Sequence, residues 1–204
     1  MAGNELVHVV DDDVDVRKSL GFLLATADFA VRLHESATAF LATATDNIDG
    51  VIVTDVRMPG IDGIEFLRQL KARGHGVSVI VMTGHGDVAL AVQAMKEGAA
   101  DFIEKPFDDE MLIDAIRSAL NNRNQAEATH PQSTEIRARL STLSEREKQV
   151  LDGLMSGLPN KTIAYDLGIS PRTVEIHRAN VMSKMGANSL SHLVRMALTA
   201  ESKG

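Results

Sequence analysis

The chain has 204 residues, 44% hydrophobic and 24% charged, which is enough to bury one or two ordinary cores. It has no cysteine, so disulfides and thiolate metal sites are excluded, and its 3% of aromatic residues argue against a stacking platform for single-stranded nucleic acid. The net charge of −7 is divided into −9 for residues 1–123 and +2 for residues 124–204, which suggests two halves with different partners, only the second tolerating a polyanion.

The first half alternates strand-like runs with helix-like segments. Between the runs, apolar residues recur at helical spacing, as at Val16, Leu20 and Leu24, and residues 87–99 begin with an Asp cap and end at Gly98. Five strands alternating with five helices predict an α/β domain over residues 1–122. Its five-stranded parallel sheet has helices on both faces, the flavodoxin-like arrangement. The strands are predicted at residues 6–10, 29–34, 50–54, 77–83 and 101–105.

The second half has a different pattern. The polar residues 121–134 lack a core pattern and predict a linker over 123–140, with a helical turn or two in EIRARLST. Residues 141–204 predict a separate all-α domain of four helices, the first of which starts with a capping box of Ser144 and Glu147. Two short helices joined by Gly-Ile-Ser, the second with Ser170 as its cap, are the signature of a helix-turn-helix.

Polar side chains gather where the predicted strands end. Function in an open parallel sheet collects at the carboxyl ends of the strands. Three carboxylates in one cleft repel one another and need a counter-charge, which a hard divalent cation such as Mg²⁺ and a lysine can supply. The same set describes a phosphoryl-transfer site in which a carboxylate attacks in line. The residues are Asp11 and Asp12 after the first strand, Asp55 after the third, Thr83 after the fourth and Lys105 after the fifth.

Each of these residues also has an ordinary structural interpretation. Residues 11–13 could form a solvated turn and a helix cap, and Asp55 could cap a helix or form a turn. Thr83 could be a strand-end hydroxyl. Their joint placement after four different strands favours a functional site over four coincidences.

The predicted helix 171–186 presents two different faces. Val174, Val181 and Met185 should pack inward, and the opposite side could enter the major groove of DNA with basic side chains on the phosphates. An amphipathic helix with a solvated face is the alternative. The candidate DNA contacts are Lys161, Arg172, Thr173, Glu175, Ile176, His177, Arg178, Ala179 and Lys184.

The motifs VVDDD, TDVRMPGIDG, MTGHGD and DFIEKPF, in this order, resemble the receiver domains of two-component response regulators, and of the FixJ branch in particular. Residues 143–185 are similar to the LuxR/NarL-type DNA-binding domain. The resemblance implies Asp55 as the phosphoacceptor, Thr83 and Lys105 as phosphoryl ligands and Phe102 as an aromatic switch. It implies Mg²⁺ or Mn²⁺ held by Asp11, Asp12, Asp55 and the backbone carbonyl of Arg57. The acidic run has a third member, Asp13, which leaves that residue as the cap of the first helix.

The resemblance also implies partners. We expect a FixL-like sensor histidine kinase, double-stranded promoter DNA and RNA polymerase, with activation of nitrogen-fixation and microaerobic genes. A domain of about +2 should bind DNA weakly as a monomer, so a phosphorylated homodimer through residues 87–120 is expected. The predicted apolar contacts of that face are Val88, Leu90, Ala91, Val92 and Met95.

Other classes of protein fit less well. An aspartyl-phosphate phosphatase commonly has an acid two residues after its nucleophile, where this chain has Arg57, so we expect no enzyme and at most slow autodephosphorylation. A DNA-binding adaptor with a phosphate-independent receiver is a second rival, and no glycine-rich loop follows the first strand to bind a nucleotide. No apolar run approaches 18 residues, and the acidic start is unlike a signal peptide, so a cytoplasmic protein without a membrane partner is expected.

Overall fold

The computed structural model of the chain describes residues 5–45, 47–84, 88–123 and 130–201. These residues divide into two compact units. One consists of a sheet with helices α1, α2, α3 and α5, and the other of α4 with helices α6 to α10. Within the described ranges, no helix is both long enough and apolar enough to cross a bilayer.

The first unit is built on a five-stranded sheet in the order β2-β1-β3-β4-β5, with every neighbouring pair parallel. The prediction of a five-stranded parallel sheet is confirmed, with strand ends shifted by at most a residue or so. The shift at the third strand matters most, because it makes Asp55 the last residue of the strand itself. The strands are β1 (Leu6–Val10), β2 (Ala30–His34), β3 (Val51–Asp55), β4 (Ser78–Thr83) and β5 (Asp101–Glu104).

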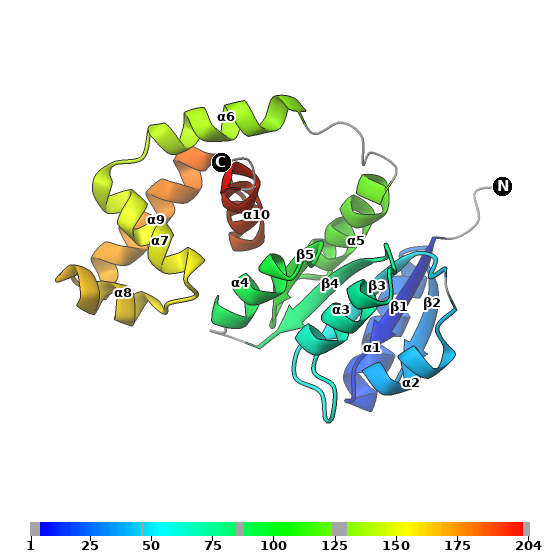
Figure 1. Ribbon diagram of the computed structural model, residues 1–204. Helices are drawn as coiled ribbons and strands as arrows, with labels where there is room; N and C mark the ends of the chain where they lie inside the picture. The colour runs from blue at the N-terminus through cyan, green and yellow to red at the C-terminus, as the bar shows by residue number, and fades with distance from the viewer. Residues whose placement is uncertain (1–4, 46, 85–87, 124–129, 202–204) are drawn as a thin grey trace. The chain divides into compact units, whose positions relative to one another are not determined.

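Helices cover both faces of this sheet (Figure 1). On one face, α1 (Val14–Thr26) and α5 (Asp109–Arg123) pack Leu24 and Ile116 against alternate residues of the central strands, such as Val53. On the other face lie α2 (Ala37–Thr43) and α3 (Gly63–Ala72), which meet through an edge-on contact of Phe40 and Phe66. Both faces are therefore buried, as expected for a parallel sheet.

The fourth helix, α4 (Val88–Lys96), is shorter than the predicted 87–99. Its predicted cap at residue 87 lies outside the described residues. The chain leaves the helix through Gly98, whose φ of 91° is in the left-handed region that glycine adopts at little cost.

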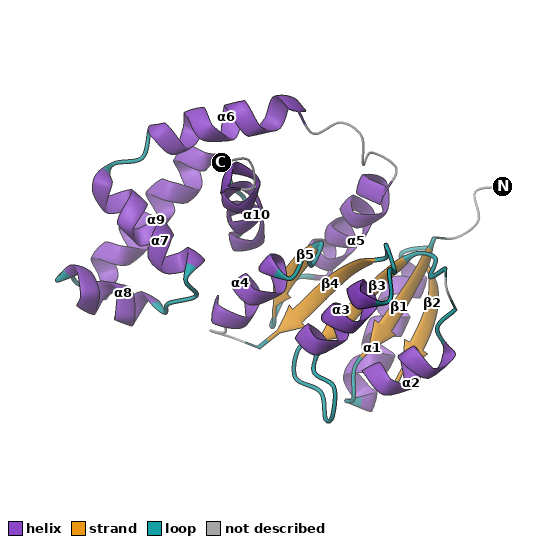
Figure 2. Cartoon of the chain, in the orientation of Figure 1, coloured by secondary structure: helices purple, strands orange, loops and turns teal. Residues whose placement is uncertain are grey.

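Helices joined by short loops make up the described residues of the C-terminal part, which contain no strand (Figure 2). The predicted capping box is present, since Ser144 Oγ accepts from the Glu147 N–H and Glu147 accepts from the Ser144 N–H. Gly168 and Gly186 end their helices with φ of 65° and 66°. The helices are α6 (His130–Ser141), α7 (Glu145–Met155), α8 (Asn160–Leu167), α9 (Pro171–Met185) and α10 (Leu190–Glu201).

The predicted linker contains a full helix that the sequence pattern did not show. Residues 130–141 form α6, whose Ile136 is buried and whose Arg139 donates to the carbonyl of Met185 over 2.6 Å. Arg137 donates to the carbonyl of Ala200 in α10. The helix therefore packs with α9 and α10, where the sequence predicted a turn or two. The predicted domain limits at 122 and 140 remain predictions.

Candidate phosphoacceptor site and DNA-binding helix

Asp55 is held firmly at the end of β3. Its Oδ2 accepts from the backbone N–H of Arg57 over 2.6 Å, and its Oδ1 lies 2.5 Å from Nζ of Lys105. The side chain is only 14% exposed. The carboxylate is thus fixed in direction by one turn hydrogen bond and one ion pair, as an in-line nucleophile requires.

Lys105 joins two of the predicted acidic residues. It follows the edge strand β5, and its Nζ also lies 3.3 Å from Oδ2 of the buried Asp11. Burial raises the pKa of the Asp11 carboxyl, and the Asp13 N–H and the charge of Lys105 offset only part of that effect. Burial alone would lower the pKa of Lys105, but its bonds to Asp55 and Asp11 outweigh this and raise it. Lys105 therefore stays charged and neutralises two carboxylates at once.

In the loop after β1, Asp11 and Asp13 accept hydrogen bonds from different backbone groups. Asp13 accepts from the N–H groups of Asp15 and Val16 and caps α1, as predicted. Asp11 accepts from the Asp13 N–H over 2.9 Å, and Arg17 donates to the Asp11 carbonyl over 2.6 Å. Sequence reasoning did not assign this fastening role to Arg17. Its position six residues after Asp11 and one turn into the helix is the signal that could have shown it.

Thr83 lies on β4, the neighbour of β3, and Phe102 lies on the edge strand β5 beyond β4. Thr83 is the last residue of β4 and is buried, with its hydroxyl 3.5 Å from the Gly84 carbonyl oxygen. Phe102 is buried in β5, three residues before Lys105. The register places Asp55 opposite Met82, so Thr83 lies one residue beyond Asp55 on the neighbouring strand. Their predicted roles toward a phosphoryl group stay predictions.

The donors around Asp55 fit a hard divalent cation that keeps much of its water. Mg²⁺ prefers oxygen ligands and usually takes one or two carboxylates, with water completing its shell. Asp11 and Asp55 supply carboxylates on either side of Lys105, and the exposed Asp12 follows directly in the chain. Within the described ranges, no three acidic or histidine side chains form a ready metal cluster. The residues therefore suit a hydrated cation rather than one enclosed by protein ligands.

Gly63 explains why the helix after Asp55 can start so close to the strand. Its N–H donates to the Val56 carbonyl over 2.9 Å, and a Cβ at this position would overlap the backbone oxygen of Asp55. The first residue of α3 therefore has to be glycine for this approach. The predicted orientation of the Arg57 carbonyl toward a metal stays a prediction.

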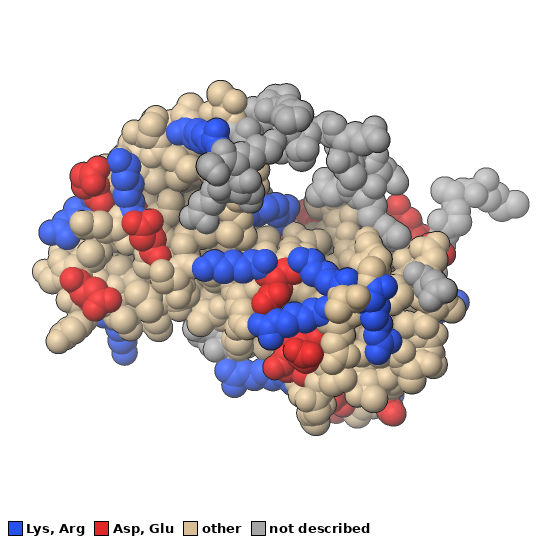
Figure 3. Space-filling view, viewed as in Figure 1, with Lys and Arg blue, Asp and Glu red and all other residues tan. Residues whose placement is uncertain are grey.

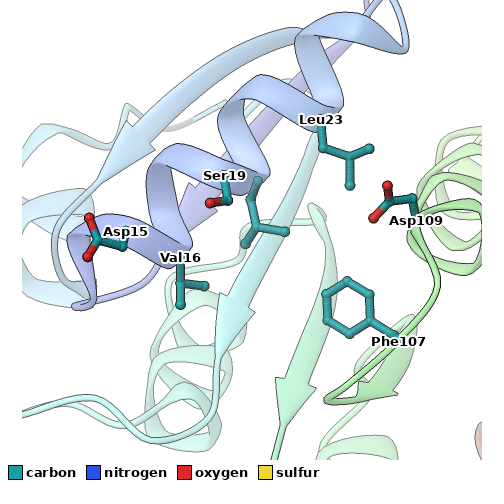
Figure 4. Close-up of a pocket in the computed structure, with 7 residues that line it drawn as sticks. Asp15, Val16, Ser19, Leu23, Phe107 and Asp109 are labelled. Atoms are coloured by element: carbon teal, nitrogen blue, oxygen red, sulfur yellow. The ribbon is translucent and has the colours of Figure 1, made fainter.

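A hollow of about 390 Å³ lies near this site, between α1 and the start of α5. Figure 4 shows Leu23 of α1 and Asp109 of α5 pointing toward one another, with the ring of Phe107 beside them. None of the residues that line it is Asp11, Asp55 or Lys105. The hollow is thus a separate, mostly apolar feature of the same domain.

The predicted recognition helix, α9, has the two faces that its sequence indicated. Val174, Val181 and Met185 are fully buried. Arg172 and Glu175 are exposed and pair over 2.9 Å, and Ile176 is 51% exposed. The outward side therefore carries one acid, one base and one large aliphatic group in the first half of the helix.

The other residues predicted to contact DNA differ in their exposure to solvent and in their hydrogen bonds within the protein. Lys161 and Ala179 are exposed, and Arg178 is half-buried. Thr173 forms a hydrogen bond with the side chain of the N-cap residue Ser170, since its Oγ1 lies 2.8 Å from Oγ of Ser170. The buried Nδ1 of His177 has no hydrogen-bond partner among the described residues and is not a group that DNA can reach from outside.

Lys184 has an internal partner that the sequence did not reveal. Its Nζ lies 2.7 Å from Oε2 of Glu147 and 3.4 Å from the Thr142 carbonyl. The hydrogen bond from Lys184 and the N–H of Ser144 lower the pKa of the Glu147 carboxyl. This ion pair links the end of α9 to the start of α7, so Lys184 stabilises the packing of these helices in addition to any contact with a DNA phosphate.

The surface charge of the described residues is mixed. On the face viewed in Figure 3, lysine and arginine side chains lie next to acidic ones. The predicted interface residues of α4 also differ in exposure: Ala91, Val92 and Met95 are buried, while Val88 and Leu90 are half-buried. The dimer face stays a prediction.

Comparison with known proteins identifies both parts. Residues 7–117 match the response regulator receiver domain, and residues 141–197 match the bacterial regulatory proteins of the luxR family. The transcriptional regulatory protein FixJ of Rhizobium meliloti is 60% identical over 94% of each chain, and that of Azorhizobium caulinodans is 59% identical over 95% of this chain and 92% of its own. The crystal structure of full-length FixJ from B. japonicum, at 49% identity, covers 98% of both chains with a TM-score of 0.56. The chain therefore belongs to the FixJ-type two-component response regulators, with an N-terminal receiver and a C-terminal LuxR-type DNA-binding domain.

Proposed function

We propose that Asp55 accepts a phosphoryl group from the phosphohistidine of a sensor kinase and that this modification activates DNA binding. The observation that carries the proposal is the fixed carboxylate of Asp55, 2.5 Å from the Lys105 ammonium and next to the buried Asp11. In the transfer, an Asp55 oxygen forms the new bond to phosphorus while the bond from phosphorus to the histidine nitrogen breaks. Lys105 then shifts from the carboxylate to the phosphoryl oxygens.

A Mg²⁺ or Mn²⁺ ion, when bound, neutralises charge on the transferring phosphoryl group. Asp11, Asp12, Asp55 and the Arg57 carbonyl are the groups that would hold it. The buried hydroxyl of Thr83, at the end of the next strand, would donate to a phosphoryl oxygen. In this proposal the acidic residues and the Arg57 carbonyl hold the cation, and Thr83 binds the phosphoryl group.

Two alternatives predict different behaviour after phosphorylation. A phosphatase would release phosphate rapidly, but the position two residues after Asp55 holds the exposed Arg57, which cannot act as a general acid or base at neutral pH. An adaptor with an inert receiver would not need Lys105 and Asp11 arranged around Asp55. We therefore propose slow autodephosphorylation and a phosphate-dependent regulator.

The output proposed for this regulator is promoter binding as a dimer. Pairing two receivers through residues 87–120 would place two α9 helices on neighbouring half-sites and double the phosphate contacts. Likeness to proteins named FixJ supports a FixL-like oxygen-sensing haem kinase as the partner. It also supports RNA polymerase recruitment at nitrogen-fixation and microaerobic genes.

The mass of the protein in solution tests this proposal. With Mg²⁺ present, addition of acetyl phosphate or beryllofluoride should move the chain from 22.0 kDa to twice that mass. Asp55→Asn should abolish the change. Asp152→Asn, which removes an exposed carboxylate from α7, should leave it intact. A wild-type chain that carries phosphate on Asp55 without pairing would refute the dimer step, and one that takes no phosphate would favour the inert adaptor.

A further inference from the structure

Glu175 is an unusual residue for a surface expected to meet a polyanion. It lies on the exposed part of α9, next to the buried Val174, and its side chain is 51% exposed. A carboxylate there approaches the phosphates of any DNA duplex and is repelled by them. Glu175 therefore weakens binding to DNA in general unless a base offers it a hydrogen-bond donor.

The structure shows how this carboxylate is held. Its Oε2 lies 2.9 Å from Nη1 of Arg172, one turn earlier on the same helix, where the Arg172 side chain is 82% exposed. Exposed pairs of this kind contribute little to stability, about 0–1 kcal/mol. Within the described chain, no hydrogen bond is formed by the other oxygen, Oε1. In this arrangement the pair uses one oxygen of Glu175 and leaves the other acceptor available to a ligand.

Only some base edges can satisfy such an acceptor. In the major groove, cytosine presents its N4 amino group, and carboxylate side chains accept from it, whereas the amino group of adenine lies beside the acceptor N7, which repels a carboxylate. Guanine presents only acceptors in that groove, and thymine presents an acceptor and a methyl group. Against those bases the desolvated carboxylate stays unpaired, which costs free energy that no other contact restores.

We propose that Glu175 is a specificity-determining residue that accepts a hydrogen bond from the amino group of one cytosine in each half-site. This inference rests on the proposed function, because it requires that α9 enter the major groove. Glu175 favours cytosine by attraction and rejects other sequences by repulsion and desolvation. Arg172, paired with it, is held along the helix and reaches the neighbouring phosphate or base from a fixed direction.

Selection from a random-sequence duplex library tests the proposal. The full chain, with Mg²⁺ and beryllofluoride, should enrich sites with a cytosine at one fixed position of each half-site. Glu175→Ala should lose that preference. Its affinity for the wild-type site should fall roughly 5- to 150-fold, the range of one lost base contact. Its affinity for random duplexes of the same length should rise a few-fold, because one repulsive charge has gone.

A matched variant separates base recognition from net charge. Glu145→Ala removes the same charge from α7, where Glu145 is 85% exposed and pairs with Lys148 over 3.0 Å. It should keep the cytosine preference. An unchanged preference in Glu175→Ala, or an equal loss in Glu145→Ala, would overturn the inference while leaving specific DNA binding intact. If the wild-type chain enriches no sequence at all, the DNA-binding function itself is refuted, and the inference with it.

Discussion

Two neighbouring histidines should make the receiver sensitive to acid. His8 of β1 and His34 of β2 have Nδ1 and Nε2 only 3.1 Å apart, and both rings pack against Phe40. A hydrogen bond between two imidazoles needs one donor and one acceptor, so the accepting ring must be neutral. Burial is the main reason that the pKa of His34 falls from 6.5 to about 4, and the charges of His8 and Arg32 lower it further. Burial also lowers the pKa of His8.

The loss of stability in acid can be calculated from the difference between the folded and unfolded pKa of His34. A base with a depressed pKa takes up its proton more readily in the unfolded chain, so His34 destabilises the fold as the pH drops below 6.5 toward 4. The full gap corresponds to about 3.4 kcal/mol, of which roughly 2 kcal/mol is lost between pH 7 and pH 5. Partial solvent access screens this, so we expect about 1 kcal/mol from His34 over that interval.

The measurement needs a signal from the sheet itself, because the chain has no tryptophan and its one tyrosine, Tyr165, lies in α8. Urea unfolding at pH 7 and pH 5, followed through the NMR amide signals of β1 and β2, should show the loss in the wild type and a smaller one in His34→Gln. The imidazole signal of His34 should titrate near pH 4. A midpoint near 6.5, or the same pH dependence in both proteins, would refute the reasoning.

Three further substitutions have expected outcomes. Gly63→Ala should lower the unfolding free energy by about 1–3 kcal/mol in urea melts, because its Cβ meets the backbone at the end of β3. Lys105→Met should tighten Mg²⁺ binding, measured by calorimetry, by roughly tenfold. It should also abolish beryllofluoride-induced pairing, since the carboxylates lose their counter-charge and the phosphoryl mimic its partner. Glu147→Gln should lower the Tm by several degrees at pH 7 and by progressively less as the pH falls below the ordinary carboxyl pKa, because a depressed pKa gives stability that is lost as the carboxylate takes up its proton. In the double variant with Lys184→Met the Tm losses should not add, because the two residues contact each other.

Features with a local cause were predictable from the sequence. The cap formed by Asp13, the capping box at Ser144 and the left-handed ends at Gly168 and Gly186 each depend on residues within one turn of the chain. The parallel sheet followed from the alternation of apolar runs and helical spacing. Asp55 was predicted as a candidate because the strand ends of a parallel sheet share one edge, and its role stays a prediction.

Features that depend on distant partners were not predictable. In helix α6, Ile136 is buried, and two arginines donate to carbonyls of other helices. Lys184 looked like a phosphate contact because its partner, Glu147, lies 37 positions away. The His8–His34 pair arises from the register of β1 on β2, which a single sequence does not reveal.

The contacts of Lys105 indicate which part of the receiver backbone should move first after phosphorylation. Its side chain holds Asp55, while its backbone N–H donates to the Thr83 carbonyl over 2.8 Å and continues the pairing of β5 with β4. The proposed phosphorylation would make the Asp55 side chain larger and more negative, and Lys105 would then move from the carboxylate to the phosphoryl oxygens. Because β5 is an edge strand with a neighbour on one side only, it resists displacement less than β1, β3 or β4. The backbone around Lys105, including the buried Phe102 of β5, is therefore the part of the receiver that should respond most to the phosphoryl group.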